Sequence, residues 1–128
     1  MSGNRYVLDT NAIVALLQGN LAVAQLLQGA EWIGISVISQ IEFLVFSGLT
    51  AGDKALFQQF LERVEVINLA SDNTALIDTI IALRQQHRIK LPDAIIGAIT
   101  LHNSASLITT DQAFAKITDL AATTWEVS

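Results

Sequence analysis

Four acidic residues stand at equivalent places in this sequence, at the end of a predicted strand or near the start of a predicted helix. They are Asp9, Glu42, Asp93 and Asp111. In a parallel sheet such places lie along one edge, so the four carboxylates are expected to converge there. An ionised carboxylate held away from water needs a cation or several hydrogen-bond donors. The pattern therefore indicates a bound cation.

Carboxylate ligands favour hard divalent cations. Mg²⁺ and Mn²⁺ take oxygen ligands, and three or four carboxylates with water suit these ions better than zinc. The chain has no cysteine, which excludes disulfides and thiolate metal sites. One or two such ions can lower the pKa of a water molecule and hold a phosphodiester for in-line attack. The acids thus predict metal-dependent cleavage of a phosphodiester.

Each acid also has a structural interpretation. Ser39 to Glu42 has the pattern of a capping box, in which the glutamate bonds the first amide of its helix. Asp93 follows Pro92 in a first helical turn, and Asp111 can cap a helix. Asp9 ends a strand, where it can form a turn, and it is expected to lack the helix N-terminus available to Asp93 and Asp111. Four residues that served only as separate caps or turn formers would have no reason to lie along one edge of the sheet. Their joint arrangement therefore favours a metal-binding site.

Strand and helix patterns alternate along the chain. Strands are predicted at 6–8, 32–37, 64–69, 106–109 and 123–127. Helices are predicted at 11–18, 21–27, 40–46, 53–63, from Ser71 or Asp72 to about Gln86, at 91–101 and at 112–117. This alternation predicts an α/β fold, with a mainly parallel central sheet and helices on both faces. The core is expected to include Trp32, Trp125, Phe43, Phe46, Phe57 and Phe60.

Length and composition limit the classes of protein. The 128 residues suit one domain, and 52% hydrophobic residues with one proline argue against disorder. Neither a membrane span, which needs about 18 apolar residues, nor a secretory signal is visible, so a cytoplasmic protein is expected. The net charge of −5 argues against binding nucleic acid by charge alone. It is compatible with a metal-dependent nuclease, because clustered carboxylates increase the acidic count.

The segments around the four acids resemble those of PIN domains. They are Val7 to Asn11, Ser36 to Glu42, Leu91 to Ala98 and Leu107 to Asp111. Their order, their spacing and the total length are similar to those of toxin ribonucleases of the VapC type. The resemblance implies a three-layer α/β/α fold over residues 1–128 as a single PIN domain. It also implies an endoribonuclease that depends on Mg²⁺ or Mn²⁺.

The resemblance assigns roles to individual residues. It implies that Asp9, Glu42, Asp93 and Asp111 are the catalytic and metal-binding acids. Asn11 matches a polar residue beside the first acid, and Thr109 matches a hydroxyl-bearing residue two positions before the last. The implied partners are an RNA substrate and a cognate antitoxin protein of a type II toxin–antitoxin pair. A homodimer is also expected.

Basic residues gather before the third acid. Arg84, Arg88 and Lys90 could form a rim that holds RNA phosphates. The alternative is a solvated helix end, where cations favour the C-terminus. His87 and His102 lack metal-ligand spacing and are expected at the surface or in structural roles.

Three alternative functions remain open. The chain could be a PIN nuclease of RNA processing rather than a toxin, or a catalytically silent scaffold that binds RNA or protein. The scaffold is disfavoured because such a protein would normally have lost one of the acids. An aspartate-nucleophile phosphatase is disfavoured too, because Asn11 stands where its second acid would be.

Overall fold

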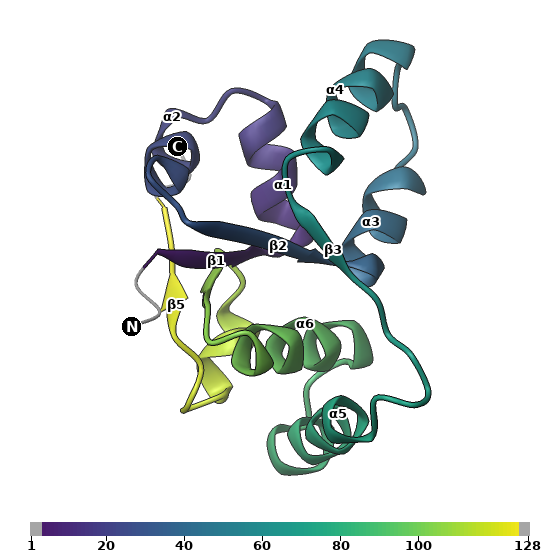
Figure 1. Cartoon of the computed structure of the whole chain (residues 1–128), viewed down its shortest axis with the longest axis vertical. Helices are drawn as coiled ribbons and strands as arrows, with labels where there is room; N and C mark the ends of the chain where they lie inside the picture. Colours follow the sequence, from purple (N-terminus) through teal and green to yellow (C-terminus); the bar gives the residue numbers. More distant parts are fainter. Residues whose placement is uncertain (1–3, 126–128) are drawn as a thin grey trace.

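The computed structural model describes residues 4–125, and these form a five-stranded sheet with helices on both faces (Figure 1). The strands are β1 (Arg5–Leu8), β2 (Trp32–Ser36), β3 (Glu65–Ile67), β4 (Ser106–Ile108) and β5 (Ala122–Thr123). Their order is β3-β2-β1-β4-β5, and neighbouring strands run parallel. The predicted α/β class is confirmed. The central strand, β1, is the one that leads into Asp9.

Six α-helices and one short 3₁₀ helix accompany the sheet in the described residues. They are α1 (Thr10–Leu17), α2 (Leu21–Leu27), α3 (Val37–Leu44), α4 (Ala51–Leu61), α5 (Thr74–His87), α6 (Leu91–His102) and the 3₁₀ helix η1 (Gln112–Lys116). Figure 1 shows α1 to α4 on one side of the sheet and α5 and α6 on the other. This arrangement gives three layers.

A separate apolar core holds each helical layer to the sheet. Under α1, α3 and α4, the rings of Phe43 and Phe57 stack with centroids 4.1 Å apart, and Phe60 continues the stack. On the other face, α6 is nearly all apolar from Ala94 to Thr100 and is buried between the sheet and α5. Burial of these side chains fixes the helices to the strands, and so fixes the residues at the strand ends.

The second strand ends earlier than predicted, and the helix after it begins earlier. Ser36 caps α3, because its Oγ accepts a hydrogen bond from the backbone amide of Ile38 (3.0 Å). The helix therefore starts at Val37 rather than at Gln40. The interpretation of Ser39 to Glu42 as a capping box is wrong, because both residues lie inside the helix.

Other expectations also need correction. Asn73, not Ser71 or Asp72, caps α5, since its Oδ1 accepts from the amide of Leu76 (3.2 Å). Phe46 is 65% exposed rather than in the core, because it follows the end of α3. Of the last predicted strand, 123–127, only Thr123 belongs to a strand, β5, and residues 124 and 125 follow it outside any strand. Residues 126 and 127 lie outside the described residues.

Within residues 4–125, no single helix is long and apolar enough to cross a membrane. The bent pair α1 and α2 reaches that length and composition only when both helices are counted together.

Candidate active site

The structure brings the four acids together around one pocket at the carboxyl edge of the sheet. The pocket has a volume of about 290 Å³ and is lined by Asp9, Glu42, Asp93 and Asp111, together with Thr10, Asn11, Phe46, Ile96 and Phe114. Strands β1 and β4 end shortly before Asp9 and Asp111, and helix α3, which follows β2 directly, carries Glu42. Helix α6 delivers the fourth from its first turn.

Asp9 is the most buried of the four acids, with 4% of its surface exposed. It is also the N-cap of α1, which corrects the expectation that it lacks a helix N-terminus. Its Oδ1 accepts from the amide of Ala12 (2.8 Å), and its Oδ2 accepts from the hydroxyl of Thr109. Burial raises the pKa of Asp9, and the charges of Asp111 and Asp93 act in the same direction, while the two hydrogen bonds oppose the rise.

A hydrogen bond connects the backbone of Asp111 to the side chain of Thr109. The amide of Asp111 donates to Oγ1 of Thr109 (2.9 Å), and Thr109 in turn donates to Asp9. Asp111 caps η1, because its Oδ1 accepts from the amide of Ala113 (2.9 Å). The structural interpretation of Asp111 as an N-cap is therefore correct. A cap uses only part of the acceptor capacity of a carboxylate, so capping does not prevent a second role.

Asp93 is the third residue of α6 and is half-buried. Burial raises its pKa, and the charges of Asp111 and Glu42 raise it further, while Lys90 opposes them. These mutual effects show that the carboxylates lie within electrostatic reach of one another. Lys90, from the predicted basic rim, is the N-cap residue of α6, three positions before Asp93.

Glu42 is the sixth residue of α3, so no helix N-terminus serves its carboxylate. Instead, the hydroxyl of Thr10 donates to its Oε1 at 2.6 Å. Sequence reasoning did not single out Thr10 as a site residue. The available signal was its position directly after Asp9, in a turn rich in side-chain donors and acceptors.

The remaining predicted residues fall into two groups. Asn11 is exposed and lines the acidic pocket. Arg84 and Arg88 are exposed near the C-terminus of α5, and neither lines the pocket. Phe46, Ile96 and Phe114 line it although sequence reasoning assigned them no part in a site.

The donor set fits a hard divalent cation that keeps part of its hydration shell. In the described part of the chain, no group of three or more Asp, Glu or His side chains is arranged to hold an ion as it stands. Mg²⁺ usually retains several waters and is bound directly by only one or two carboxylates. Four carboxylates around a pocket of about 290 Å³ match that mode of binding.

Fold and pocket together define an α/β protein with clustered carboxylates at the carboxyl edge of a parallel sheet. The family model described as PIN domain matches residues 6–120. The chain belongs to the PIN domain family. No curated protein sequence matches the chain at a significant level.

Several solved structures share this fold. A toxin–antitoxin complex from Klebsiella pneumoniae is 29% identical with a TM-score of 0.75, and the match covers 91% of this chain and 95% of that one. VapBC2 from Rickettsia felis, bound to a promoter DNA fragment, is 23% identical with a TM-score of 0.75, covering 95% and 99%. VapBC-1 from nontypeable Haemophilus influenzae is 25% identical with a TM-score of 0.73, covering 94% and 98%. The predicted resemblance to VapC-type PIN domains is confirmed.

Proposed function

We propose that this protein is an endoribonuclease that depends on Mg²⁺ or Mn²⁺, acting as a single PIN domain over residues 1–128. The observation that carries the proposal is the convergence of Asp9, Glu42, Asp93 and Asp111 on one pocket. Such a cluster is costly without a cation, because burial and like charges already raise the pKa of Asp9 and Asp93.

The four acids bind the cation, directly or through its waters, and neighbouring groups keep them in place. The amide of Ala12 and the hydroxyl of Thr109 hold both oxygens of Asp9, so this carboxylate has a fixed orientation. Asp111 and Asp93 sit at helix N-termini, where the helix dipole favours a negative charge. A divalent cation bound here supplies a water of lowered pKa and offsets charge on the phosphodiester.

RNA binding depends on a few cations. Lys90 lies near Asp93 and is the basic residue best placed to meet a phosphate beside the site. Arg84 and Arg88 extend a basic rim away from it, and Asn11 offers an amide at the pocket. With seven basic residues in the chain, affinity for RNA outside the site should be modest.

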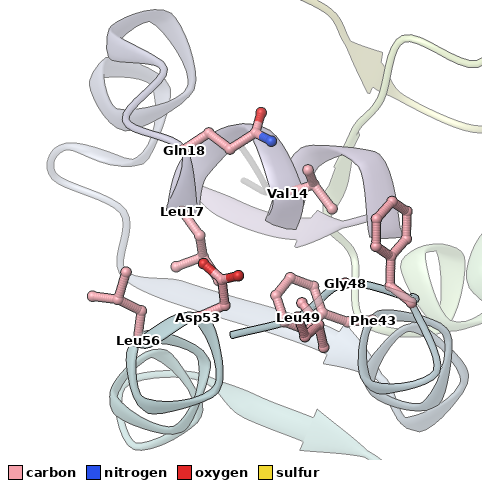
Figure 2. A pocket seen from close by; sticks show the side chains of 9 residues that line it. Val14, Leu17, Gln18, Phe43, Gly48, Leu49, Asp53 and Leu56 are labelled. Atoms are coloured by element: carbon pink, nitrogen blue, oxygen red, sulfur yellow. The ribbon is translucent and has the colours of Figure 1, made fainter. Parts of the chain in front are cut away.

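We propose further that the protein is the cytoplasmic toxin of a type II toxin–antitoxin pair and that it forms a homodimer. Its similarity to structures titled as toxin–antitoxin complexes supports an antitoxin partner. The surface beside the site supports a protein partner too, because α3 and the residues just after it expose Ile41, Leu44, Val45 and Phe46. A second pocket of about 140 Å³, lined mainly by apolar side chains from α1 and from 43–56, adjoins them (Figure 2). Exposed apolar surface of this kind is typical of interfaces.

Metal dependence is tested with purified protein and end-labelled single-stranded and hairpin RNAs. Cleavage is expected with Mg²⁺ or Mn²⁺ and should be lost in EDTA. Asp93→Asn, which keeps the size of the side chain at that position, is expected to be inactive and provides the control against contaminating ribonucleases. Undiminished cleavage in EDTA would remove the metal mechanism. No cleavage of any RNA would favour the silent scaffold.

The partner is tested by coexpression with the small protein encoded beside this one. A stable complex with suppressed cleavage is expected of a toxin, and its mass also gives the number of copies of this chain. A complex that cleaves RNA as fast as the free protein, or no complex at all, would favour a role in RNA processing.

A further inference from the structure

Glu42 differs from the other three acids in how it is held. Asp9 and Asp111 are N-caps, and Asp93 lies in a first helical turn, so each has backbone amides or a helix dipole close by. Glu42 is the sixth of the eight residues of α3, so it is neither a cap nor in a first helical turn. Its side chain is also the longest of the four and has the most rotatable bonds. Its carboxylate needs another restraint if it is to have one position.

Thr10 provides a restraint of that kind. Its Oγ1 donates to Oε1 of Glu42 at 2.6 Å, a short distance typical of hydrogen bonds to a charged acceptor. Thr10 is the first residue of α1, directly after Asp9, and its β-branched side chain is restricted at χ1. The bond uses one carboxylate oxygen of Glu42 and leaves Oε2 available. It thereby links the carboxylate on α3 to the turn that carries Asp9.

The hydroxyl of Thr10 is not needed to cap helix α1. Capping of α1 is already performed by Asp9, which accepts from Ala12. Thr74 is a matched comparison, because it is also the first residue of its helix and follows the N-cap Asn73. Thr74 lies at the start of α5, on the opposite side of the sheet from α1 (Figure 1). Its side chain is exposed and does not line the acidic pocket, so Thr74 controls for the helical position alone.

We propose that Thr10 is a positioning residue, which holds Oε1 of Glu42 and so keeps Oε2 free for a cation that binds in the pocket. This inference rests on the proposed metal-dependent function. Groups that hydrogen-bond metal ligands typically change metal affinity or activity by about 10- to 100-fold when they are removed. Thr10 should act through the affinity of the site for its cation, because its hydroxyl is engaged by Glu42 and the carboxylate of Glu42 is the group that binds the cation.

The test measures Mn²⁺ binding directly, through the electron paramagnetic resonance signal of free Mn²⁺. Thr10→Val keeps the shape and removes the hydroxyl, and it should weaken Mn²⁺ binding by about tenfold or more. Thr10→Ser keeps the hydroxyl and should stay close to wild type. Thr74→Val is the control for changing a first-turn threonine and should bind Mn²⁺ as wild type does.

A double variant separates positioning from a merely structural contact. In a Glu42→Ala background, Thr10→Val should cause no further loss of Mn²⁺ affinity, because the group it orients is absent. In RNA cleavage, Thr10→Val should raise the Mn²⁺ concentration needed for half-maximal rate much more than it lowers the rate at saturating Mn²⁺. Circular dichroism checks folding, and Thr10→Ala replaces Thr10→Val if that variant does not fold, with the same expected result.

The outcomes distinguish the two proposals. A wild-type protein that binds Mn²⁺ and cleaves RNA, beside a Thr10→Val variant of equal affinity, would overturn the role of Thr10 alone. Equal losses in Thr10→Val and Thr10→Ser would overturn it too, since the hydroxyl would then not matter. A wild-type protein that binds no Mn²⁺ would overturn the proposed function and this inference together.

Discussion

The hydroxyl of Thr109 donates a hydrogen bond to Oδ2 of Asp9, although the two residues are 100 positions apart in the sequence. Both are nearly inaccessible to solvent, with 5% and 4% of their surfaces exposed. The same hydroxyl accepts from the amide of Asp111, so it connects the ends of the neighbouring strands β1 and β4. The buried carboxylate of Asp9 thus depends on a hydroxyl that only folding brings close to it.

Removing that hydroxyl should destabilise the protein. Thr109→Val leaves Asp9 with one donor fewer and the amide of Asp111 without its acceptor, at a cost of about 1–3 kcal/mol. The loss should be larger at neutral than at acidic pH, because the hydrogen bond favours the charged form of Asp9. Urea unfolding in EDTA at two pH values measures both effects. Thr109→Ser, which keeps the hydroxyl, is the control, and equal losses in the two variants would contradict this account.

The stability of the metal-free protein should fall as pH rises above the ordinary carboxyl range. Burial raises the pKa of Asp9 and Asp93 above the ordinary 3.8. Between that value and the raised pKa, the folded protein keeps protons that the unfolded chain has released. The contribution of these two carboxyl groups to the unfolding free energy is therefore complete below the pKa of the unfolded chain. It is lost as pH rises through their raised pKa in the folded protein. Urea unfolding in EDTA across this range measures it, and a stability that rises over the same range would contradict it.

Asp9→Asn isolates the share of Asp9 in that pH dependence. Asparagine can still cap α1 through its oxygen, but its amide cannot accept from Thr109. At low pH the variant should therefore be less stable than wild type. As pH rises, this difference should shrink, because wild type acquires a buried charge at Asp9 and the variant does not. Added Mg²⁺ should stabilise wild type, by roughly 2.7 kcal/mol at a hundred times its dissociation constant. Mg²⁺ should stabilise the variant much less. If the unfolding free energies of the two proteins change with pH in parallel, Asp9 carries no destabilising buried charge.

Glu42→Gln and Asp111→Asn should separate metal binding from stability. The side-chain carbonyl of a glutamine in place of Glu42 can still accept from Thr10, and asparagine is among the best N-caps for η1. Both variants should keep their unfolding free energy within about 1 kcal/mol of wild type. Mn²⁺ affinity and RNA cleavage should nevertheless fall. Variants that cleave at the wild-type rate would show that these two acids have only structural roles.

Two phenylalanines close in sequence should respond differently to truncation. Phe57 is 1% exposed and stacks on Phe43, so Phe57→Ala should cost about 3–5 kcal/mol. Phe46 is 65% exposed, and Phe46→Ala should stay within about 1 kcal/mol. Denaturant unfolding of the isolated protein compares them. Similar losses for both would mean that Phe46 is buried in solution, for example by a second copy of the chain.

Much of the fold and the identity of the clustered acids could be read from the sequence. Strand and helix patterns have different periods, and their alternation leaves few ways to build a sheet other than parallel. The carboxyl ends of parallel strands share an edge, so acids after β1 and β4 had to come close. Local signals also located Asp93 in a first helical turn and Asp111 at a cap.

Only the tertiary structure decided the contacts between distant segments. Ser36 and Ser39 carry the same side chain, but β2 pairs up to Ser36, and Ser36 rather than the predicted Ser39 caps α3. Phe46 has the same apolar character as Phe43, but the end of α3 leaves it exposed. The bonds from Thr10 to Glu42 and from Thr109 to Asp9 join residues 32 and 100 positions apart. Local sequence cannot specify such pairs, because their geometry depends on how the helices and strands pack.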